Sequence, residues 1–194
     1  VEYFVQKSIA NGIDIIRIFD ALNDPRNLKT AIDATKKEKG HVQVAFSYTT
    51  SPVHNNEYFA TLAKQLEEMG ADSICIKDMS GLLKPYDAYD LVKKLKSSVK
   101  VPIELHTHYT AGLASMTTLK AIEAGVDIID TAISPLAMGT SQPPTEPIVA
   151  ALAGVLCIGF IQVGLASAAY SAASASSELR SEIATMRSDG QSLA

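Results

Sequence analysis

Two histidines and a lysine stand where short apolar runs of the sequence end. His106 and His108 close the run 102–108, and Lys77 closes the run 73–77. Side chains two residues apart on a strand share a face, so the imidazoles should point the same way, with Lys77 at matching depth on the preceding strand. Such a cluster predicts a metal site. The alternative from residue type alone is a pair of hydrogen-bonded histidines beside a solvated lysine.

The runs that carry these residues alternate with helical segments. We expect strands near 13–19, 42–47, 73–77, 102–108 and 127–133. We expect helices over 1–10, 24–39, 55–69, 85–96 and 114–123, the second of them with Asp24 as its N-cap. Near-continuous apolar strands between helices predict a parallel α/β fold. The expected fold is an incomplete TIM (β/α)8 barrel with about five βα units and its chemistry at the carboxyl ends of the strands.

Three junctions of the chain repeat one motif, a helix-ending glycine followed after one residue by an aspartate and then a strand. The glycines are Gly12, Gly70 and Gly125. Their spacing is about two strand–helix units of the usual barrel size, which agrees with the five predicted units.

Composition narrows the class of protein. The chain has 194 residues, of which 47% are hydrophobic, so it can bury a substantial core. The net charge is only −4, and no basic stripe suggests nucleic acid or a membrane surface, so we expect a small-molecule substrate. Cys75 and Cys157 lie in apolar segments, which indicates a reducing, cytoplasmic setting without disulfides. The first residues are expected to form a helix, not a signal peptide.

A loop from Ser134 to Pro147 follows the last predicted strand and places Thr140 near the carboxyl ends. Thr140 could face the metal, or it could bond its own backbone.

The sequence changes character after Gly154. No charged residue occurs between Pro147 and Ser177. We therefore expect a barrel domain over 1–154 and an apolar, then Ala/Ser-rich, tail over 155–194. A transmembrane hairpin is the alternative, and a frameshift near Gly154 is a further hypothesis for the sudden loss of charge.

Five blocks of the sequence resemble the carboxyltransferase domain of biotin-dependent enzymes. This family includes the oxaloacetate decarboxylase alpha subunit, the pyruvate carboxylases and transcarboxylase. The resemblance covers residue 1 to about residue 154, and its blocks are 17–27, 47–52, 76–83, 105–112 and 139–143. The stretch 139–146 is most similar to the decarboxylase alpha subunit and to the separate pyruvate carboxylase B subunit.

The resemblance implies a divalent metal held by His106, His108 and a carbamylated Lys77. Zn²⁺ is the expected ion, with Mn²⁺ and Co²⁺ as alternatives. Carbamylation needs a neutral amine, which burial favours, and it turns a cation into a carboxylate ligand. An aspartate ligand, and the arginine and glutamine that hold the keto acid, belong to upstream strands that this sequence lacks. Tyr109 replaces an aspartate found in many relatives, so the surroundings of the ligands are expected to differ.

The reaction implied by the resemblance moves CO2 between carboxybiotin, on a carrier domain, and pyruvate or oxaloacetate. Thr140 matches the threonine that moves a proton between biotin and the enolate, so it is the expected catalytic and biotin-binding residue. The direction of transfer stays open. The protein is expected in the cytoplasm, with membrane association through a partner subunit also open.

Two other interpretations remain. Isopropylmalate synthases and hydroxymethylglutaryl-CoA lyases are related metal-dependent barrels with His-x-His, although they lack a lysine at the position of Lys77. Alternatively, the chain is an inactive half-barrel that serves as an interaction module, because the aspartate ligand is missing. The isolated chain is expected to be inactive, and to oligomerise or to need the missing barrel half.

Overall fold

A computed structural model describes residues 1–153 of the chain. The predictions for the tail, including Cys157, the membrane hairpin and the frameshift, lie outside these residues. Two compact units divide the chain, Val1–Ile148 and Val149–Ala194, and all five strands belong to the first. The elements are α1 (Glu2–Ala10), β1 (Ile15–Asp20), the 3-10 turn η1 (Pro25–Asn27), α2 (Lys29–Lys37), β2 (His41–Ser47), α3 (Asn56–Glu68), β3 (Ser73–Asp78), α4 (Pro85–Lys96), β4 (Ile103–Thr107), α5 (Ala114–Ala124), β5 (Ile128–Ile129) and the 3-10 turn η2 (Ser134–Leu136).

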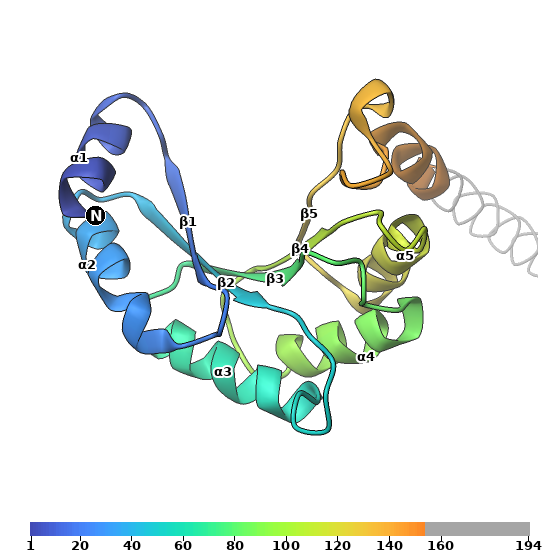
Figure 1. Cartoon of the computed structure of the whole chain (residues 1–194), viewed down its shortest axis with the longest axis horizontal. Helices are drawn as coiled ribbons and strands as arrows, with labels where there is room; N and C mark the ends of the chain where they lie inside the picture. Colours follow the sequence, from blue (N-terminus) through green and yellow to red (C-terminus); the bar gives the residue numbers. More distant parts are fainter. Residues whose placement is uncertain (154–194) are drawn as a thin grey trace, which may run out of the picture. The chain divides into compact units, whose positions relative to one another are not determined.

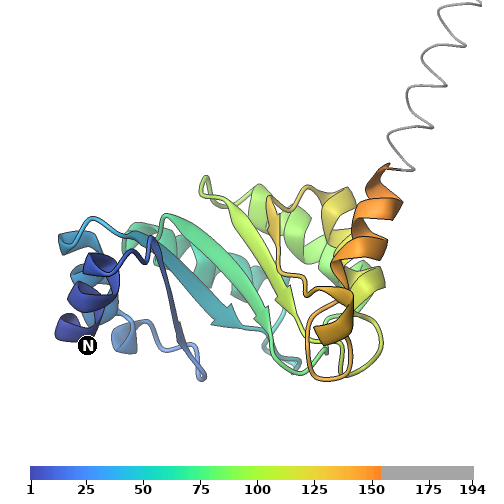
Figure 2. The same ribbon diagram turned by 90° about the horizontal axis from the view of Figure 1, so that it is seen from above.

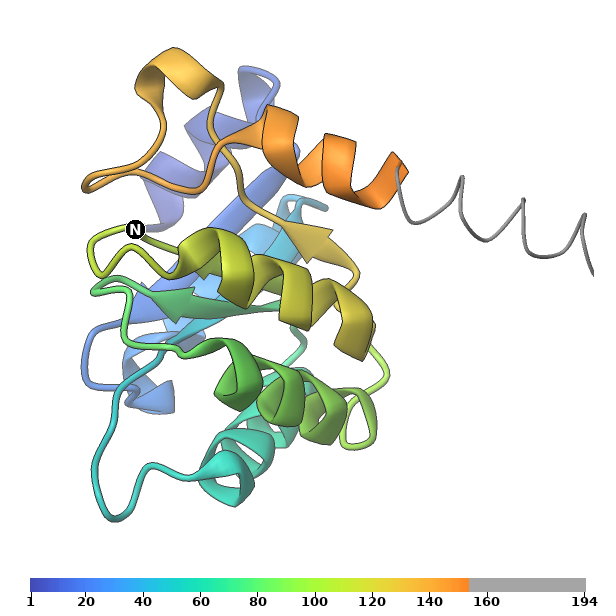
Figure 3. The ribbon, with the colours of Figure 1, turned by 90° about the vertical axis from the view of Figure 1, so that its right-hand side faces the viewer.

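The five strands form one parallel sheet in the order β1-β2-β3-β4-β5. The helices lie along one face of this curved sheet, and its other face is open (Figure 1). From the side, α3, α4 and α5 follow one another across the outside of the strands (Figure 3). Five strand–helix units in sequential order confirm the predicted fragment of a TIM barrel.

The hydrophobic core lies between the sheet and the helices. Ile74 and Ile76 of β3 are fully buried in it, and Phe46 of β2 stacks on Phe59 of α3 with ring centroids 5.0 Å apart. Helices α2, α4 and α5 also contribute residues. Those of α4, Ala88, Leu91, Val92 and Leu95, have the spacing expected of an amphipathic helix. Burying a side chain of this size stabilises the fold by about 1.5–3 kcal/mol. The core therefore fixes which face of each strand turns away from the helices.

Three expected boundaries differ from the structure. The strand predicted over 127–133 is only two residues long, Ile128–Ile129, because Ala132 bonds to the segment at Pro143 and Pro144 in place of β4. The helix predicted from Asp24 begins as a 3-10 turn, and the α-helix starts only at Lys29. The Asp24 carboxylate accepts a hydrogen bond from the N–H of Arg26, two residues on, so the predicted N-cap is present although the first turn is 3-10. The loop predicted to end at Pro147 is shorter than expected, because residues 145–153 are helical.

The predicted glycine repeat is confirmed. Gly12, Gly70 and Gly125 each end a helix with a positive φ, of 94°, 104° and 95°. This backbone conformation is the one that favours glycine at a helix end. Within residues 1–153, no helix combines the length and the apolar character that crossing a membrane requires.

Gly81 fixes the loop after β3 against the end of β4. Its φ is +66°, and a Cβ atom there would lie 2.7 Å from the carbonyl oxygen of His108. Gly112 has a similar φ of +73° but open space around the missing Cβ, so it is a matched control. We expect Gly112→Ala to lower the free energy of unfolding by about 1 kcal/mol and Gly81→Ala by roughly 3 kcal/mol, because only the latter adds a clash with backbone. Urea unfolding of both variants measures this, and equal losses would contradict it.

Candidate metal centre at the carboxyl ends of the strands

Side chains alternate along the strands between the helical core and the open face. Ile76 and Leu105 face the core, so their neighbours Lys77 and His106 point to the open face. Lys77 and His106 are partners in the register of β3 and β4. The structure thus places the lysine and the first histidine side by side, near the carboxyl ends of adjacent strands. The arrowheads in Figure 2 show these strands running in the same direction.

The two predicted histidines meet through their outer ring nitrogens. The Nε2 atoms of His106 and His108 are 3.0 Å apart. The other nitrogen of each ring faces an oxygen acceptor: Nδ1 of His106 is 2.7 Å from Oδ2 of Asp130, and Nδ1 of His108 is 2.5 Å from the carbonyl oxygen of Thr140. A carboxylate and a carbonyl only accept, so these partners assign the proton of each neutral ring to Nδ1.

This tautomer leaves two nitrogen lone pairs facing each other. A contact of that kind is unfavourable unless a cation lies near both atoms. Two imidazoles on one Zn²⁺ ion at the usual 2.0–2.1 Å would have their nitrogens about 3.3 Å apart in tetrahedral geometry, close to the distance seen. The amide of Gln142 also lies 3.5 Å from Nε2 of His108, at the limit of a hydrogen bond. The donor atoms and their outer hydrogen bonds therefore fit a metal ion.

Lys77 is the buried amine of this cluster. It is 8% exposed, and its Nζ lies 4.7 Å from the ring centroid of Phe19. Within residues 1–153 it forms no ion pair with a carboxylate. An amine held close to a metal site without a counter-ion suits conversion to an anionic ligand.

The ligand set in the described chain is incomplete. No group of three His, Cys, Asp or Glu side chains within residues 1–153 has an arrangement that could hold a metal ion. A metal ion bound to the two histidines would need a third protein ligand, either a modified Lys77 or a residue outside this part of the chain.

Thr140 reaches the site through its backbone. Its carbonyl oxygen accepts from His108, and the loop is held by the N–H of Tyr109 donating to the carbonyl of Ser141 at 2.7 Å. The Thr140 hydroxyl makes no hydrogen bond within the described residues. Met138 and Gly139 both have positive φ, of 66° and 58°, and build the turn that presents this carbonyl.

Arg17 lies across the open face from the histidines and bonds to the carboxylate that holds His106. The sequence did not indicate it as a site residue. Arg17 of β1 donates to Asp130 at 2.8 Å and forms an ion pair with Glu104 of β4. Gln43 of β2 donates to the other oxygen of Glu104 at 2.6 Å and accepts from Arg17. Asp130 holds Nδ1 of His106 in turn, so one network runs from the first strand to a predicted ligand.

The charges of this network shift the pKa values of its acids in opposite directions. Burial raises the pKa of Glu104, and the nearby charge of Asp130 raises it further. Burial also acts to raise the pKa of Asp130, but hydrogen bonds from His106 and Arg17 outweigh it and hold that pKa well below its usual range. Asp130 is therefore the anion that orients His106.

Cys75 lies on the same face but does not have the properties of a nucleophile. Burial raises the pKa of its thiol to about 12, so it stays protonated at neutral pH.

One sequence signal could have identified the four residues of this network, Arg17, Gln43, Glu104 and Asp130. Each polar side chain interrupts or directly follows an apolar run, at the position that alternation turns away from the core. Buried charges of this kind are rarely found without a partner.

The chain is similar to known proteins over most of its length. The HMGL-like family model matches residues 13–174. The chain is 64% identical over 154 residues to the pyruvate carboxylase B subunit of Methanocaldococcus jannaschii, covering 79% of this chain and 27% of that protein. It is 50% identical over 156 residues to the methylmalonyl-CoA carboxyltransferase 5S subunit of Propionibacterium freudenreichii subsp. shermanii, covering 79% of this chain and 31% of that protein.

Among solved structures, the chain is similar to the carboxyl transferase domain of Rhizobium etli pyruvate carboxylase with pyruvate and biocytin. The TM-score is 0.78 at 42% sequence identity, over 79% of this chain and 27% of that one. The chain thus spans about a third or less of the length of the relatives that it matches.

Proposed function

The chain belongs to the HMGL-like family, whose model matches residues 13–174. We propose that it forms the part of a biotin-dependent carboxyltransferase domain that carries the metal-binding site. The proposed reaction moves CO2 between carboxybiotin, carried by a separate domain, and pyruvate or oxaloacetate. Relatives named as a pyruvate carboxylase B subunit and as a carboxyltransferase subunit support this reaction class. The observation that carries the proposal is the pair of Nε2 atoms of His106 and His108, 3.0 Å apart beside Lys77.

In this proposal His106, His108 and a carbamylated Lys77 hold a divalent ion, with Zn²⁺ favoured by imidazole and oxygen ligands over Mn²⁺ or Co²⁺. The ion would polarise the keto acid carbonyl and stabilise the negative charge left when CO2 departs. Asp130 and the Thr140 carbonyl keep both imidazoles in the tautomer that a ligand needs. The Thr140 hydroxyl, which is free of other hydrogen bonds within the described residues, would carry the proton between biotin and substrate.

The carboxyltransferase interpretation is favoured over a metal-dependent enzyme of the isopropylmalate synthase or hydroxymethylglutaryl-CoA lyase type. Lys77 is the distinguishing residue, because the resemblance assigns a carbamylated lysine to the carboxyltransferases alone. Its register position beside His106 and its burial suit that role. The aspartate ligand that the resemblance implies would come from a strand other than the five described here.

The carbamate on Lys77 is the direct test. With zinc and 13C-labelled bicarbonate, we expect NMR to show one carbamate resonance per chain, and Lys77→Arg to abolish it, because a guanidinium cannot react with CO2 in this way. Lys84→Arg is the matched control, since Lys84 is exposed and seven residues further along the chain. A resonance that survives Lys77→Arg, or none in the unmodified chain, would refute this ligand set.

A further inference from the structure

Asp78 is a buried carboxylate at the carboxyl end of β3, directly after Lys77. It is 0% exposed, and within residues 1–153 no lysine, arginine or histidine forms an ion pair with it. Alternation along β3 turns Lys77 to the open face and Asp78 to the helical side of the sheet. A buried carboxylate without a cation is costly unless hydrogen bonds replace the water that it loses. Donors on the helical side of the sheet must therefore hold Asp78.

Three neutral donors hold this carboxylate. Oδ1 accepts from the N–H of Leu82 at 2.9 Å, and Oδ2 accepts from the N–H of Leu83 at 3.0 Å. The third donor is the hydroxyl of Thr107, 2.9 Å from Oδ2. The two amides belong to the loop after β3, whereas Thr107 is the last residue of β4. A single side chain thus joins this loop to the neighbouring strand.

Thr107 lies between the two predicted ligands His106 and His108 in the chain. It is 1% exposed, and alternation turns it to the face opposite theirs. It is the register partner of Asp78, one step beyond the pair of Lys77 and His106. The carbonyl oxygen of Asp78 also accepts from the N–H of His108, at 3.1 Å. Asp78 therefore holds the backbone that carries both imidazoles, and it does so from the residue next to Lys77.

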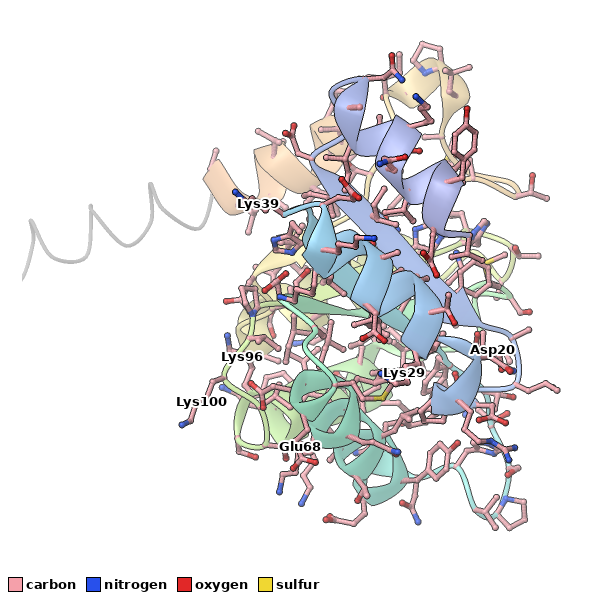
Figure 4. All side chains as sticks on the ribbon, turned by 90° about the vertical axis from the view of Figure 1, so that its left-hand side faces the viewer. Asp20, Lys29, Lys39, Glu68, Lys96 and Lys100 are labelled. Atoms are coloured by element: carbon pink, nitrogen blue, oxygen red, sulfur yellow. The ribbon has the colours of Figure 1, made fainter. Side chains whose placement is uncertain are left out.

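The amino ends of the strands are joined by exposed groups instead. The carboxylate of Asp127 accepts from the N–H of Ile103, at the start of β4, and from Lys96, both at 2.8 Å. Lys96 lies at the end of the strand–helix layer opposite Asp20, where β1 ends (Figure 4). The side chains of Lys96 and Asp127 are 38% and 36% exposed, so water screens their attraction. A hydrogen bond buried from water is stronger, and β4 has one where the predicted metal ligands lie.

We propose that Asp78 is a positioning residue of the metal centre, acting on His106 and His108 through Thr107. The inference rests on the proposed function, because it takes the two histidines as ligands. Their Nε2 atoms are 3.0 Å apart, and a shift or rotation at the end of β4 would change this distance. Within the described residues the Asp78 carboxylate bonds neither ring. Its effect is therefore on the placement of the ligands.

The test removes one hydroxyl with Thr107→Val, which keeps the branched shape of the side chain. Thr117→Val is the matched control, since Thr117 of α5 is 0% exposed and its hydroxyl donates to the carbonyl of Leu83 at 2.8 Å. That bond holds the same loop but involves neither β3 nor β4. Each variant loses one buried hydrogen bond, so both should lower the urea midpoint of unfolding by a similar amount.

Only Thr107→Val is expected to change the metal centre. It should lower the zinc affinity of the 194-residue chain about tenfold, as loss of a group that orients a metal ligand does. It should also shift the visible absorption bands of the cobalt(II) complex, which report the geometry of the ligands. Thr117→Val should leave both unchanged, and Thr107→Ser, which keeps a hydroxyl, should restore both.

Amide hydrogen exchange in the metal-free chain separates this inference from the proposed function. Relative to the N–H of Ile76 in β3, the N–H of His108 should exchange about tenfold faster in Thr107→Val and at an unchanged rate in Thr117→Val, because only the former loosens its bond to Asp78. If this result holds while the unmodified chain binds no zinc, the metal function fails and the positioning of His108 by Asp78 stands.

Three results would overturn the inference. The first is equal exchange at His108 in Thr107→Val and Thr117→Val, and the second is equal zinc affinity of these two variants when the unmodified chain binds zinc. The third is an equal loss of zinc affinity in Asp127→Ala, which frees only the amino end of β4. Such a loss would mean that any loosening of this strand disturbs the site.

Discussion

His106→Ala is expected to lower the zinc affinity of the chain by more than a hundredfold. Removing only an outer hydrogen-bond partner of a metal ligand costs roughly 10- to 100-fold in affinity, and this variant removes a ligand itself. In the unmodified chain the Nε2 atoms of His106 and His108 are already 3.0 Å apart, so both donors are preorganised for one ion. In the variant His108 must bind the ion alone, and this advantage is lost. Competition with a zinc-binding dye measures the change.

His54→Ala is the control for this experiment. His54 bonds Ser51 within an exposed loop and is not part of the cluster. Its loss should leave zinc affinity within a factor of about two of the unmodified chain, in line with small effects of surface substitutions. His108→Ala should match His106→Ala, since the two rings share the site. Equal affinity of His106→Ala and His54→Ala for zinc would show that the histidine pair does not bind the ion.

Arg17→Met is expected to lower the free energy of unfolding by about 2–3 kcal/mol. The variant keeps a long apolar side chain but leaves two carboxylates, Glu104 and Asp130, without their cation on the open face of the sheet. Breaking a fully buried pair costs about 3–5 kcal/mol. Arg17 and Asp130 are 29% and 30% exposed, so solvent screening puts the expected loss below that range. Urea unfolding at neutral pH measures it.

The pH dependence separates the loss of charge from the loss of packing. The pKa of Glu104 is already raised by burial, and removing Arg17 takes away a charge that lowers it. When the pKa of an acid is higher in the folded than in the unfolded state, the acid favours the folded state at low pH, where it is protonated. This stabilisation is lost as the pH rises through the folded-state pKa. The destabilisation by Arg17→Met should therefore shrink as the pH falls from 8 to 5.

Two controls accompany Arg17→Met. Arg26→Met removes a guanidinium that is 90% exposed and, within residues 1–153, paired only with Asp24, so its urea unfolding curve should stay close to that of the unmodified chain. Arg17→Lys restores the charge without the forked geometry and should recover part of the loss. An Arg17→Met variant as stable as Arg26→Met would mean that the network does not hold the strands together.

The network also explains how a partial barrel keeps the geometry of a predicted site. Arg17 lies on β1, yet it contacts side chains of β4 and of the residue after β5. These bonds join the two ends of the curved sheet, whereas contacts between adjacent strands join only neighbours (Figure 1). Loss of Arg17 should therefore loosen Asp130 and, through it, the ring of His106.

Much of the fold could be predicted from local patterns in the sequence. Apolar runs of strand length, glycines after helices and capping residues such as Asn55 are properties of neighbouring residues, and the five strands occur where these patterns place them. The same alternation placed His106, His108 and Lys77 on one face. The largest differences are the start of the second helix, the end of the last loop and the strand predicted over 127–133, which is only two residues long. That strand stops early because Ala132 pairs with Pro144, a long-range contact that local patterns do not indicate.

The partners of the site residues were decided by the tertiary structure. Arg17 and Asp130 are 113 residues apart in the chain, and no periodicity links them. Their contact depends on the register of four strand pairs and on the curvature of the sheet, which brings the first strand to face the last. Likewise, the carbonyl that fixes the tautomer of His108 comes from Thr140, whose side chain alone the sequence had suggested. Residue type and spacing thus determined which groups face the site, and long-range packing determined which atoms hold them in place.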